Sequence, residues 1–176
     1  MDLKRSKPMY TLEKATEQEL EICWDILNDG RSFQREQGFV QWSDEYPTYE
    51  MICEDIRTEK GYVLKVDGDI AAYMLIDFDG EPAYDKIKGK WNSDEKYAVI
   101  HRMAISKKYR NRGLSGIAFA LVEELCRKNG LRYLRCDTDE QNKRMQHVFK
   151  KNGFSYCGII DYFGDGKLAF DKLLDR

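Results

Sequence analysis

Residues 109–116, YRNRGLSG, bring small residues and positive charge to the point where a strand-like run gives way to a helical run. Gly113 allows a sharp turn there, and the small side chains that follow it let a ligand approach the backbone. The first N–H groups of a helix are unpaired and carry a partial positive charge, so phosphates bind there readily. Arg110 and Arg112 add charge beside the turn. This combination suits a pyrophosphate group.

Two common phosphate-binding motifs are absent from the sequence. Neither the P-loop pattern G-x-x-x-x-G-K-[ST] nor the dinucleotide fingerprint G-x-G-x-x-G occurs. The first absence argues against an ordinary NTPase. A Gly-x-x-Gly turn also serves purely structural purposes, so a structural turn and a ligand site both stay open at this point.

The elements that must position this turn mix strands with helices along the chain. Strands are predicted at residues 9–15, 97–105 and 131–138, and hairpins at 62–78 and 154–174. Helices are predicted at 16–30, 49–59, 114–129 and 139–153. Gly30 suits the end of the first helix, residues 31–39 suit a short helix or ordered loop, and polar residues 79–96 suit a surface loop or a flap. This order predicts an α/β or α+β layer fold in one domain, residues 1–176.

Composition excludes several classes of protein. The 29 basic and 31 acidic residues give a net charge of −2, unlike the basic footprint of a nucleic-acid binder. No apolar run reaches the ~20 residues of a membrane span, and the N-terminus lacks the apolar core of a signal peptide. We therefore expect a cytoplasmic protein without nucleic-acid or membrane partners. The five cysteines form no Cys-x-x-Cys pair and sit among apolar residues, which favours buried reduced thiols.

Two segments resemble the motifs of the GCN5-related N-acetyltransferases, the GNAT family. Residues 101–125, HRMAISKKYRNRGLSGIAFALVEEL, are similar to its motif A, Q/R-x-x-G-x-G/A, with Ser115 at the Gly/Ala position. Residues 142–154, NKRMQHVFKKNGF, are similar to motif B. The motif A positions are occupied in order by Arg110, Asn111, Arg112, Gly113, Leu114 and Ser115, and those of motif B by Asn142, Lys151, Gly153 and Phe154. Segments EPAYDKIKGKW and IHRMAIS also resemble a bacterial branch of the family.

The resemblance implies a GNAT fold with acetyl-CoA as cosubstrate. The expected sheet is central, mixed and mostly antiparallel, with six or seven strands splayed in the middle and helices on both faces. The pantetheine arm would lie in the splay, and the pyrophosphate would rest on the glycine turn. The implied cofactor-binding residues are Met103, Ala104 and Ile105 on the strand, Arg110, Asn111, Arg112, Gly113, Leu114, Ser115 and Gly116 on the turn, and Asn142 and Phe149 on the helix of motif B.

The implied chemistry is direct attack of an amine on the thioester, with no cysteine nucleophile and no metal. The motif B tyrosine, often the general acid of the family, is replaced by Phe149. His101 and Asp137 are the catalytic candidates, with Glu95 a further possible base. A structural strand histidine explains His101 equally well, and Asp137 could orient His101, bind the amine or cap a loop. Arg102 is expected to pair with an acid, and His147 to lie on the surface.

Loop aromatics are the candidates for the acceptor site, which the family builds from its first helices and the loops near the last hairpin. Trp42, Tyr46 and Tyr84 are the predicted substrate-binding residues, with Trp91 beside them, although each also suits packing.

The predicted function is transfer of an acetyl group to a primary amine of a small molecule or peptide, in a possible homodimer. An acyl-CoA-binding module with little turnover, suggested by Phe149, and a nucleotide-binding α/β protein remain as alternatives.

Overall fold

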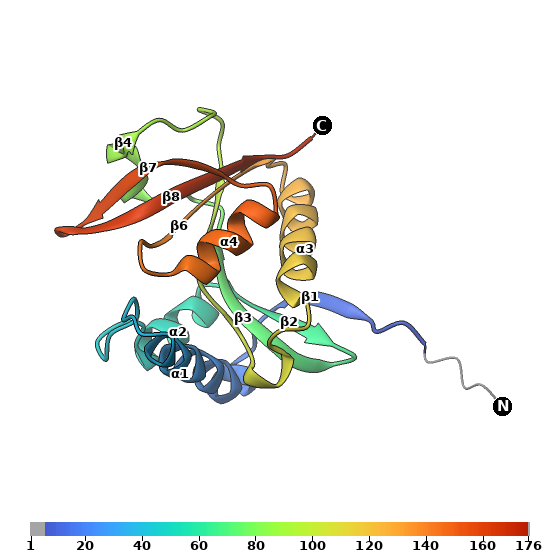
Figure 1. Cartoon of the computed structure of the whole chain (residues 1–176). Coiled ribbons are helices and arrows are strands. Elements are labelled where there is room, and N and C mark those ends of the chain that lie inside the picture. The colour runs from blue at the N-terminus through green and yellow to red at the C-terminus, as the bar shows by residue number, and fades with distance from the viewer. Residues whose placement is uncertain (1–5, 176) are drawn as a thin grey trace.

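The computed structural model describes residues 6–175, which form one eight-stranded sheet and four α-helices (Figure 1). The strands are β1 (Tyr10–Lys14), β2 (Gly61–Val66), β3 (Asp69–Asp77), β4 (Lys88–Gly89), β5 (Ala98–Ile105), β6 (Tyr133–Asp139), β7 (Ser155–Tyr162) and β8 (Asp165–Leu173). The helices are α1 (Leu20–Glu36), α2 (Tyr49–Arg57), α3 (Leu114–Lys128) and α4 (Lys143–Lys151), with short 3-10 helices η1 (Glu17–Glu19), η2 (Pro82–Lys86) and η3 (Lys107–Tyr109).

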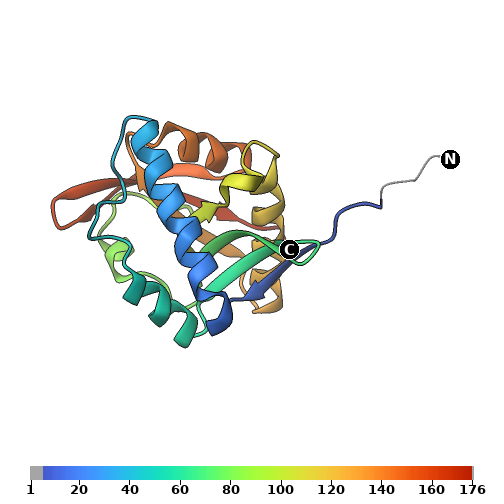
Figure 2. The ribbon, with the colours of Figure 1, turned by 90° about the horizontal axis from the view of Figure 1, so that it is seen from below.

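Helices cover both faces of the sheet, because side chains alternate between faces along each strand (Figure 2). Leu64 and Ala72 pack with α3 and α4 in one core, whereas Val63 and Tyr73 pack with α1 and α2 in a second. A third cluster, around Tyr84, lies under the segment that carries η2 and β4. None of the helices within residues 6–175 is long and apolar enough to cross a membrane.

The sheet opens between β5 and β6. Its order is β1-β2-β3-β5-β6-β8-β7-β4, and the pair β5–β6 is the parallel one among antiparallel neighbours. Their pairing is limited to Ala98 with Leu134 and Val99 with Arg135, after which the strands separate. The expected fold class is therefore confirmed, with helices on both faces and a splay in the middle.

A bulge lies in β5 just beyond its last pairing with β6. Between Tyr73 and Leu75 of β3 there is one residue, but two residues of β5, Arg102 and Met103, face it. Arg102 has a φ of 49°, in the left-handed region that residues other than glycine enter at a cost of about 1–2 kcal/mol. Bulges bend strands and re-aim side chains, and this one lies in the part of β5 that no longer pairs with β6.

A buried polar network holds the bulge. The guanidinium of Arg102 donates from Nη2 to Asp55 Oδ1 at 2.5 Å and from Nε to Asp55 Oδ2 at 3.0 Å. Tyr73 Oη donates to the same carboxylate at 2.7 Å. Burial by itself lowers the pKa of Arg102, but the hydrogen bonds and charges of Asp55 and Tyr46 together outweigh it and leave that pKa above its ordinary value. The expected pairing of Arg102 with an acid is thus confirmed, and its partner comes from α2.

Helix α1 runs past its predicted end at Gly30 and continues to Glu36, so that prediction was wrong. A Cβ at Gly30 would lie 3.0 Å from Cζ3 of Trp42 and 3.3 Å from Cβ of Ala104. The glycine therefore lets α1 pack closely on Trp42 and β5 rather than ending the helix. The short helix or loop expected at residues 31–39 is mostly the last part of α1.

Other predicted elements lie close to their expected positions, with two differences. The sheet has eight strands instead of six or seven, because two residues of the predicted loop at 79–96 pair with β7 as β4. The last hairpin turns at Phe163 and Gly164, both with positive φ, rather than at residues 164–166. Thr48 caps α2 as predicted, accepting from the N–H of Met51.

We expect Asp55→Asn to destabilise the protein by about 3–5 kcal/mol, because it leaves the buried Arg102 charge without its counter-ion. The control is Glu54→Gln on the same helix, which breaks an exposed pair with Arg57 and should cost less than about 1 kcal/mol. Urea unfolding of the two variants measures the difference. Equal stability of the two variants would show that the network does not hold the bulge.

Candidate active site

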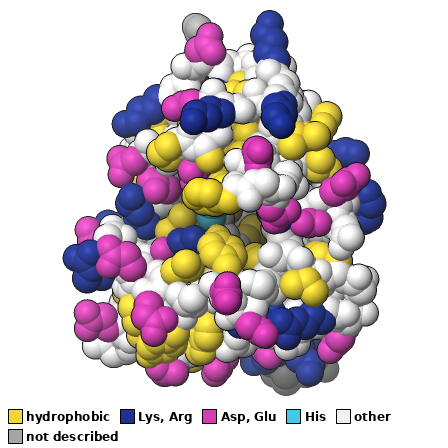
Figure 3. Space-filling view, turned by 90° about the vertical axis from the view of Figure 1, so that its left-hand side faces the viewer, with side chains coloured by type: hydrophobic (Ala, Val, Ile, Leu, Met, Phe, Trp, Pro, Cys, Tyr) yellow, Lys and Arg dark blue, Asp and Glu magenta, His cyan; other side chains and the backbone are white. Residues whose placement is uncertain are grey.

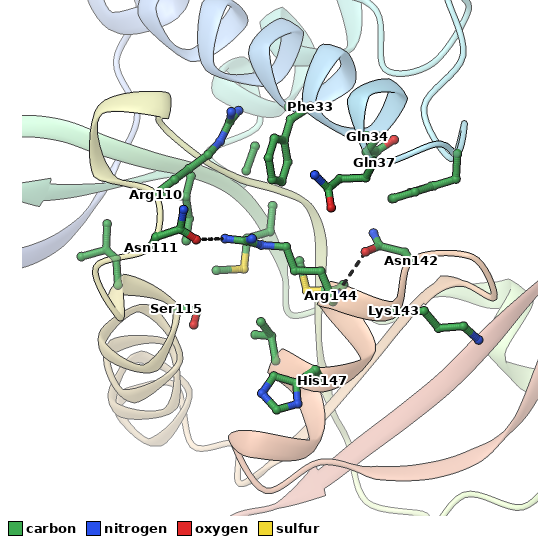
Figure 4. A pocket seen from close by; sticks show the side chains of 18 of the residues that line it. Phe33, Gln34, Gln37, Arg110, Asn111, Ser115, Asn142, Lys143, Arg144 and His147 are labelled. Carbon is green, nitrogen blue, oxygen red and sulfur yellow. Dashed lines mark hydrogen bonds between the residues drawn. The ribbon is translucent and has the colours of Figure 1, made fainter.

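The first cavity at the splay has a volume of about 630 Å³. It lies between the end of β5, the start of α3 and helices α1 and α4 (Figure 4). Met103, Ala104 and Ile105, the three strand residues predicted to bind the cofactor, all line it. From the turn it is lined by Arg110, Asn111, Gly113, Leu114 and Ser115.

The glycine turn has the backbone expected of it. Gly113 is the residue before α3, with φ 70° and ψ 18°, and no side chain caps the helix there. Asn111 also has a positive φ, 61°. The first N–H groups of a 15-residue helix are therefore left for a ligand. Arg112 and Gly116, also predicted to bind the cofactor, do not line the cavity, and the guanidinium of Arg112 lies 5.8 Å from the ring of Tyr109.

Positive charge gathers around this cavity. The guanidinium of Arg110 lies 4.3 Å from the ring centre of Phe33, and its Nη2 is buried without a hydrogen-bond partner among residues 6–175. Burial lowers the pKa of Arg110, as expected of a cation whose charge is poorly compensated. Arg144 also lies over Phe33, at 5.1 Å, and donates to Asn111 Oδ1 at 2.9 Å. Lys143 and Lys151 add two more cations, whereas no aspartate or glutamate is among the lining residues.

Asn142 is used for structure more than the motif suggested. Its Oδ1 accepts from the N–H of Met145 at 3.0 Å, which caps α4, and its Nδ2 donates to Gln41 Oε1 at 2.9 Å. It nevertheless lines both cavities of the site. Its side chain therefore fixes α4 and the loop after α1 on either side of the splay.

A second cavity, of about 640 Å³, adjoins the first. It lies on the other side of Met103 and reaches from β5 to the tip of the β7–β8 hairpin. Five residues line both cavities, so that the two share a wall at the splay: Gln34, Trp42, Met103, Asn142 and Met145.

His101 lines the second cavity next to a glutamate from the η2 segment. Its Nε2 lies 3.3 Å from Glu81 Oε2, and Glu81 Oε1 accepts from the N–H of Ala83. The hydrogen bond with His101 is the main reason why the pKa of Glu81 is below its ordinary value, in spite of burial. If Nε2 carries the proton and donates to Glu81, Nδ1 is left to accept one from a substrate.

Asp137 lines the same cavity but does not contact His101, so the expectation that it might orient the imidazole was wrong. Its Oδ2 accepts from Tyr84 Oη at 2.6 Å and from Tyr162 Oη at 3.1 Å. Burial, together with the nearby carboxylate, raises the pKa of both phenols above the ordinary range. Both tyrosines therefore stay protonated as donors, and Oδ1 of Asp137 has no hydrogen-bond partner within the described chain.

Only part of the predicted acceptor wall is present. Trp42 and Tyr46 line the second cavity, and Tyr46 Oη accepts from Arg102 at 3.2 Å. Tyr84 is fully buried and lines neither cavity, so its predicted contact with substrate was wrong. Trp91 is also outside both cavities, because it stacks on the buried guanidinium of Arg135 at 4.3 Å.

Of the remaining candidate residues, some line a cavity and one does not. Phe149 was expected to bind the cofactor, but it lines the second cavity rather than the first, with its ring packed against Phe154 and Phe170. His147 is exposed, as expected, at the edge of the first cavity. Glu95 pairs with Arg132 at 2.5 Å and lines neither cavity, which removes it as a candidate base.

Several lining residues escaped the sequence analysis. Glu81 opens the segment EPAYDKIKGKW, and the packing of its η2 turn against the sheet brings it to His101. Tyr162 ends β7, and strand pairing brings it to Asp137. Arg144 lies inside the motif B segment, and its charge beside Asn142 is the signal that was overlooked.

None of the five cysteines lines either cavity, and all are buried as expected except Cys53, which is half-buried. Burial raises the pKa of Cys23 and Cys126 to about 12, and Cys136 is completely buried. All five are free, and no group of three or more His, Cys, Asp or Glu side chains within residues 6–175 is placed to hold a metal ion.

Solved structures of known proteins share this architecture. A GNAT-family acetyltransferase from Streptococcus agalactiae is 31% identical, with a TM-score of 0.86, over 95% of this chain and 96% of its own. A GNAT-family acetyltransferase from Listeria monocytogenes is 19% identical, with a TM-score of 0.74, over 96% and 100%. The aminoglycoside acetyltransferase AAC(6')-Ib, solved in complex with coenzyme A, is 19% identical, with a TM-score of 0.69, over 94% and 95%.

No curated protein matches the chain. The acetyltransferase (GNAT) family, however, matches residues 21–154. This range includes the glycine turn, helix α4 and strand β5, which lines both cavities. This match covers most of the chain and agrees with the splayed sheet. The chain therefore belongs to the acetyltransferase (GNAT) family.

Proposed function

We propose that this protein transfers an acetyl group from acetyl-CoA to a primary amine, within one domain spanning residues 1–176. The observation that carries the proposal is the pair of cavities that meet at Met103, where β5 and β6 separate. One cavity is lined by four cations, and the other by three carboxylates, a histidine and two cations that are held in ion pairs. A phosphate-bearing donor and an amine acceptor can thus approach one another from opposite sides.

The first cavity fits coenzyme A. The uncapped start of α3 and the unpartnered Nη2 of Arg110 are both suited to a pyrophosphate. Arg144 and Lys143 would add charge from the opposite wall. The backbone of Met103–Ile105 would then border the pantetheine arm, because β6 does not pair with this part of β5. The bound donor supplies a thioester, whose carbonyl carbon is the electrophile.

The chain's own groups would manage the protons. His101 takes a proton from the ammonium through Nδ1, and Glu81 holds the ring and stabilises the imidazolium that forms. The neutral nitrogen forms a bond to the carbonyl carbon, the carbon–sulfur bond breaks, and sulfur leaves with the electron pair. A thiol has a pKa of about 8.5, so the thiolate can leave without an acid at Phe149. The thiolate takes up the second proton of the nitrogen. The first proton passes from His101 to solvent.

Gly113→Asp should weaken acetyl-CoA binding about a hundredfold, because it places a carboxylate where the pyrophosphate would lie. Gly113→Asn is the matched control, since asparagine has the same shape, tolerates a positive φ and carries no charge. Calorimetric titration of both variants with acetyl-CoA, with ATP and NAD for comparison, measures the effect. Equal affinities of the two variants would place the phosphate elsewhere, and preference for ATP or NAD would favour the nucleotide-binding alternative.

His101→Ala should lower kcat by about a hundredfold or more and leave acetyl-CoA affinity nearly unchanged, as expected on removal of a general base. Glu95→Gln, in an exposed ion pair outside both cavities, should retain the rate. Thiol release over a panel of primary amines is the assay. Unchanged turnover in His101→Ala would make the histidine structural, and acetyl-CoA binding without thiol release from any amine would favour the binding module that Phe149 suggests.

Glu81→Gln should lower stability near pH 7 more than near pH 3. The pKa of Glu81 is held below its ordinary value of 4.5, so the contact with His101 contributes stability above that value and loses it as the pH falls through the lowered pKa. Urea midpoints at the two pH values test this. In a His101→Ala background the pH dependence of the Glu81→Gln effect should become smaller but not vanish, because the N–H of Ala83 also lowers the pKa of Glu81. An unchanged pH dependence there would mean that His101 is not its main cause.

A further inference from the structure

The tip of the β7–β8 hairpin carries an aromatic residue in an unfavourable place. Phe163 has a φ of 52°, at a turn position that asparagine, aspartate and glycine normally occupy, and its side chain is fully exposed. A bulky residue there costs conformational energy and also exposes apolar surface to water. Phe163 therefore does not stabilise the fold, and it lines the second cavity.

Further apolar surface surrounds the same cavity from the loop that follows α1. Val40 is 58% exposed and Tyr46 37% exposed, and both line the cavity across from Phe163. Figure 3 looks onto this side of the molecule and shows hydrophobic side chains around a hollow in which a histidine is visible. Exposed apolar residues gathered at a cavity mouth commonly mark a ligand-binding surface.

The interior of the cavity is negatively charged once its ion pairs are counted. Its two cations are already neutralised, since Arg102 pairs with Asp55, and Lys167 lies 3.0 Å from Asp139 and 2.8 Å from Asp165. Asp137 receives hydrogen bonds only from neutral phenols, and no ion pair to it exists within residues 6–175.

After these pairings, the described residues that line the cavity include a free carboxylate that can bind a cation and no free positive side chain that can bind an anion. The carboxylate of Asp137 is free to bind an ammonium group, with Glu81 and His101 beside it. A carboxylate or phosphate on the acceptor would find no free positive side chain in this cavity.

We propose that the acceptor is a small primary amine with a single ammonium group on an apolar, uncharged body. Its ammonium group would bind Asp137 and its body would lie against Phe163, Tyr46 and Val40. The volume of about 640 Å³ is within the range for small-molecule sites. This inference rests on the proposed function, which assigns the second cavity to the acceptor.

The geometry disfavours two other kinds of amine. An amino acid brings a carboxylate toward Asp137 and Glu81, where like charges repel. A polyamine or an amino sugar such as kanamycin brings several charged or hydroxyl groups that the apolar mouth would strip of water without replacing their hydrogen bonds. The class proposed is the one whose charge and apolar surface both find a partner.

The test compares four amines with purified protein and saturating acetyl-CoA: 2-phenylethylamine, ethylamine, L-phenylalanine and kanamycin. We expect kcat/KM for 2-phenylethylamine to exceed that for ethylamine, which lacks the body, by at least about tenfold. L-Phenylalanine, which has the same body and a carboxylate, should react still more poorly than 2-phenylethylamine. Preference for kanamycin or L-phenylalanine would overturn the inference and leave acetyl transfer itself intact.

Two variants test which residues cause the preference among amines, and a third serves as the control. Phe163→Asn suits the positive φ and should lower kcat/KM for 2-phenylethylamine about tenfold without changing that for ethylamine. Asp137→Asn, which still accepts the phenol hydrogen bonds, should raise KM for both amines and leave acetyl-CoA affinity unchanged. Tyr156→Asn removes an exposed aromatic of the same hairpin that lines neither cavity, and should have no effect. Equal losses in the Phe163 and Tyr156 variants would overturn the role of the mouth.

Calorimetric binding of 2-phenylethylamine separates this inference from the proposed function. If no amine is acetylated, the proposed function fails, yet binding of 2-phenylethylamine that weakens in Phe163→Asn and in Asp137→Asn would still support the apolar, anionic site. Absence of such binding, or binding that neither variant weakens, would overturn it.

Discussion

The ion pair between Arg102 and Asp55 is the interaction on which the site depends. It holds a residue with positive φ in the middle of β5, at the point where one extra residue enters the strand. By then β5 has already parted from β6, because only Ala98 and Val99 pair with that strand, and the bulge re-aims the side chains of the unpaired stretch. Both cavities are bounded by the part of β5 that follows. A local backbone cost is thus offset by a buried ion pair from a helix that is distant in sequence.

The two cavities differ in charge as their proposed occupants require. Arg110, Lys143, Arg144 and Lys151 line the first, without any carboxylate among the residues described there. In the second, the cations are paired and carboxylates remain. Since fields are stronger in partly buried sites than in water, this division favours a phosphate-bearing donor on one side and an ammonium-bearing acceptor on the other. Met103 lies between them, where the reacting atoms would meet.

Replacement of the motif B tyrosine by Phe149 is compatible with this arrangement. The ring packs with Phe154 and Phe170 under the second cavity, so it supports the floor between α4 and β8. The groups proposed to handle protons and bind the amine come instead from β5, β6 and the segment at the start of η2. In the proposed reaction no side chain of α4 carries a proton, and Asn142, which caps that helix, mainly fixes it to the loop after α1.

The sequence by itself determined what depends on a few neighbouring residues. The glycine turn before α3, the cap at Thr48 and the hairpin at Asp67 and Gly68 follow from local backbone preferences, and the motifs placed them correctly. Gly30 shows the limit of such reasoning, because its role comes from Trp42 rather than from its own helix.

Only the tertiary structure decided which side chains meet. Glu81 reaches His101 and Tyr84 reaches Asp137 through the packing of the η2 segment on the sheet, and Tyr162 reaches Asp137 through strand register. A shift of one residue in a strand moves every side chain to the opposite face. Such pairings arise from the packing of the whole sheet, and no short stretch of sequence contains them.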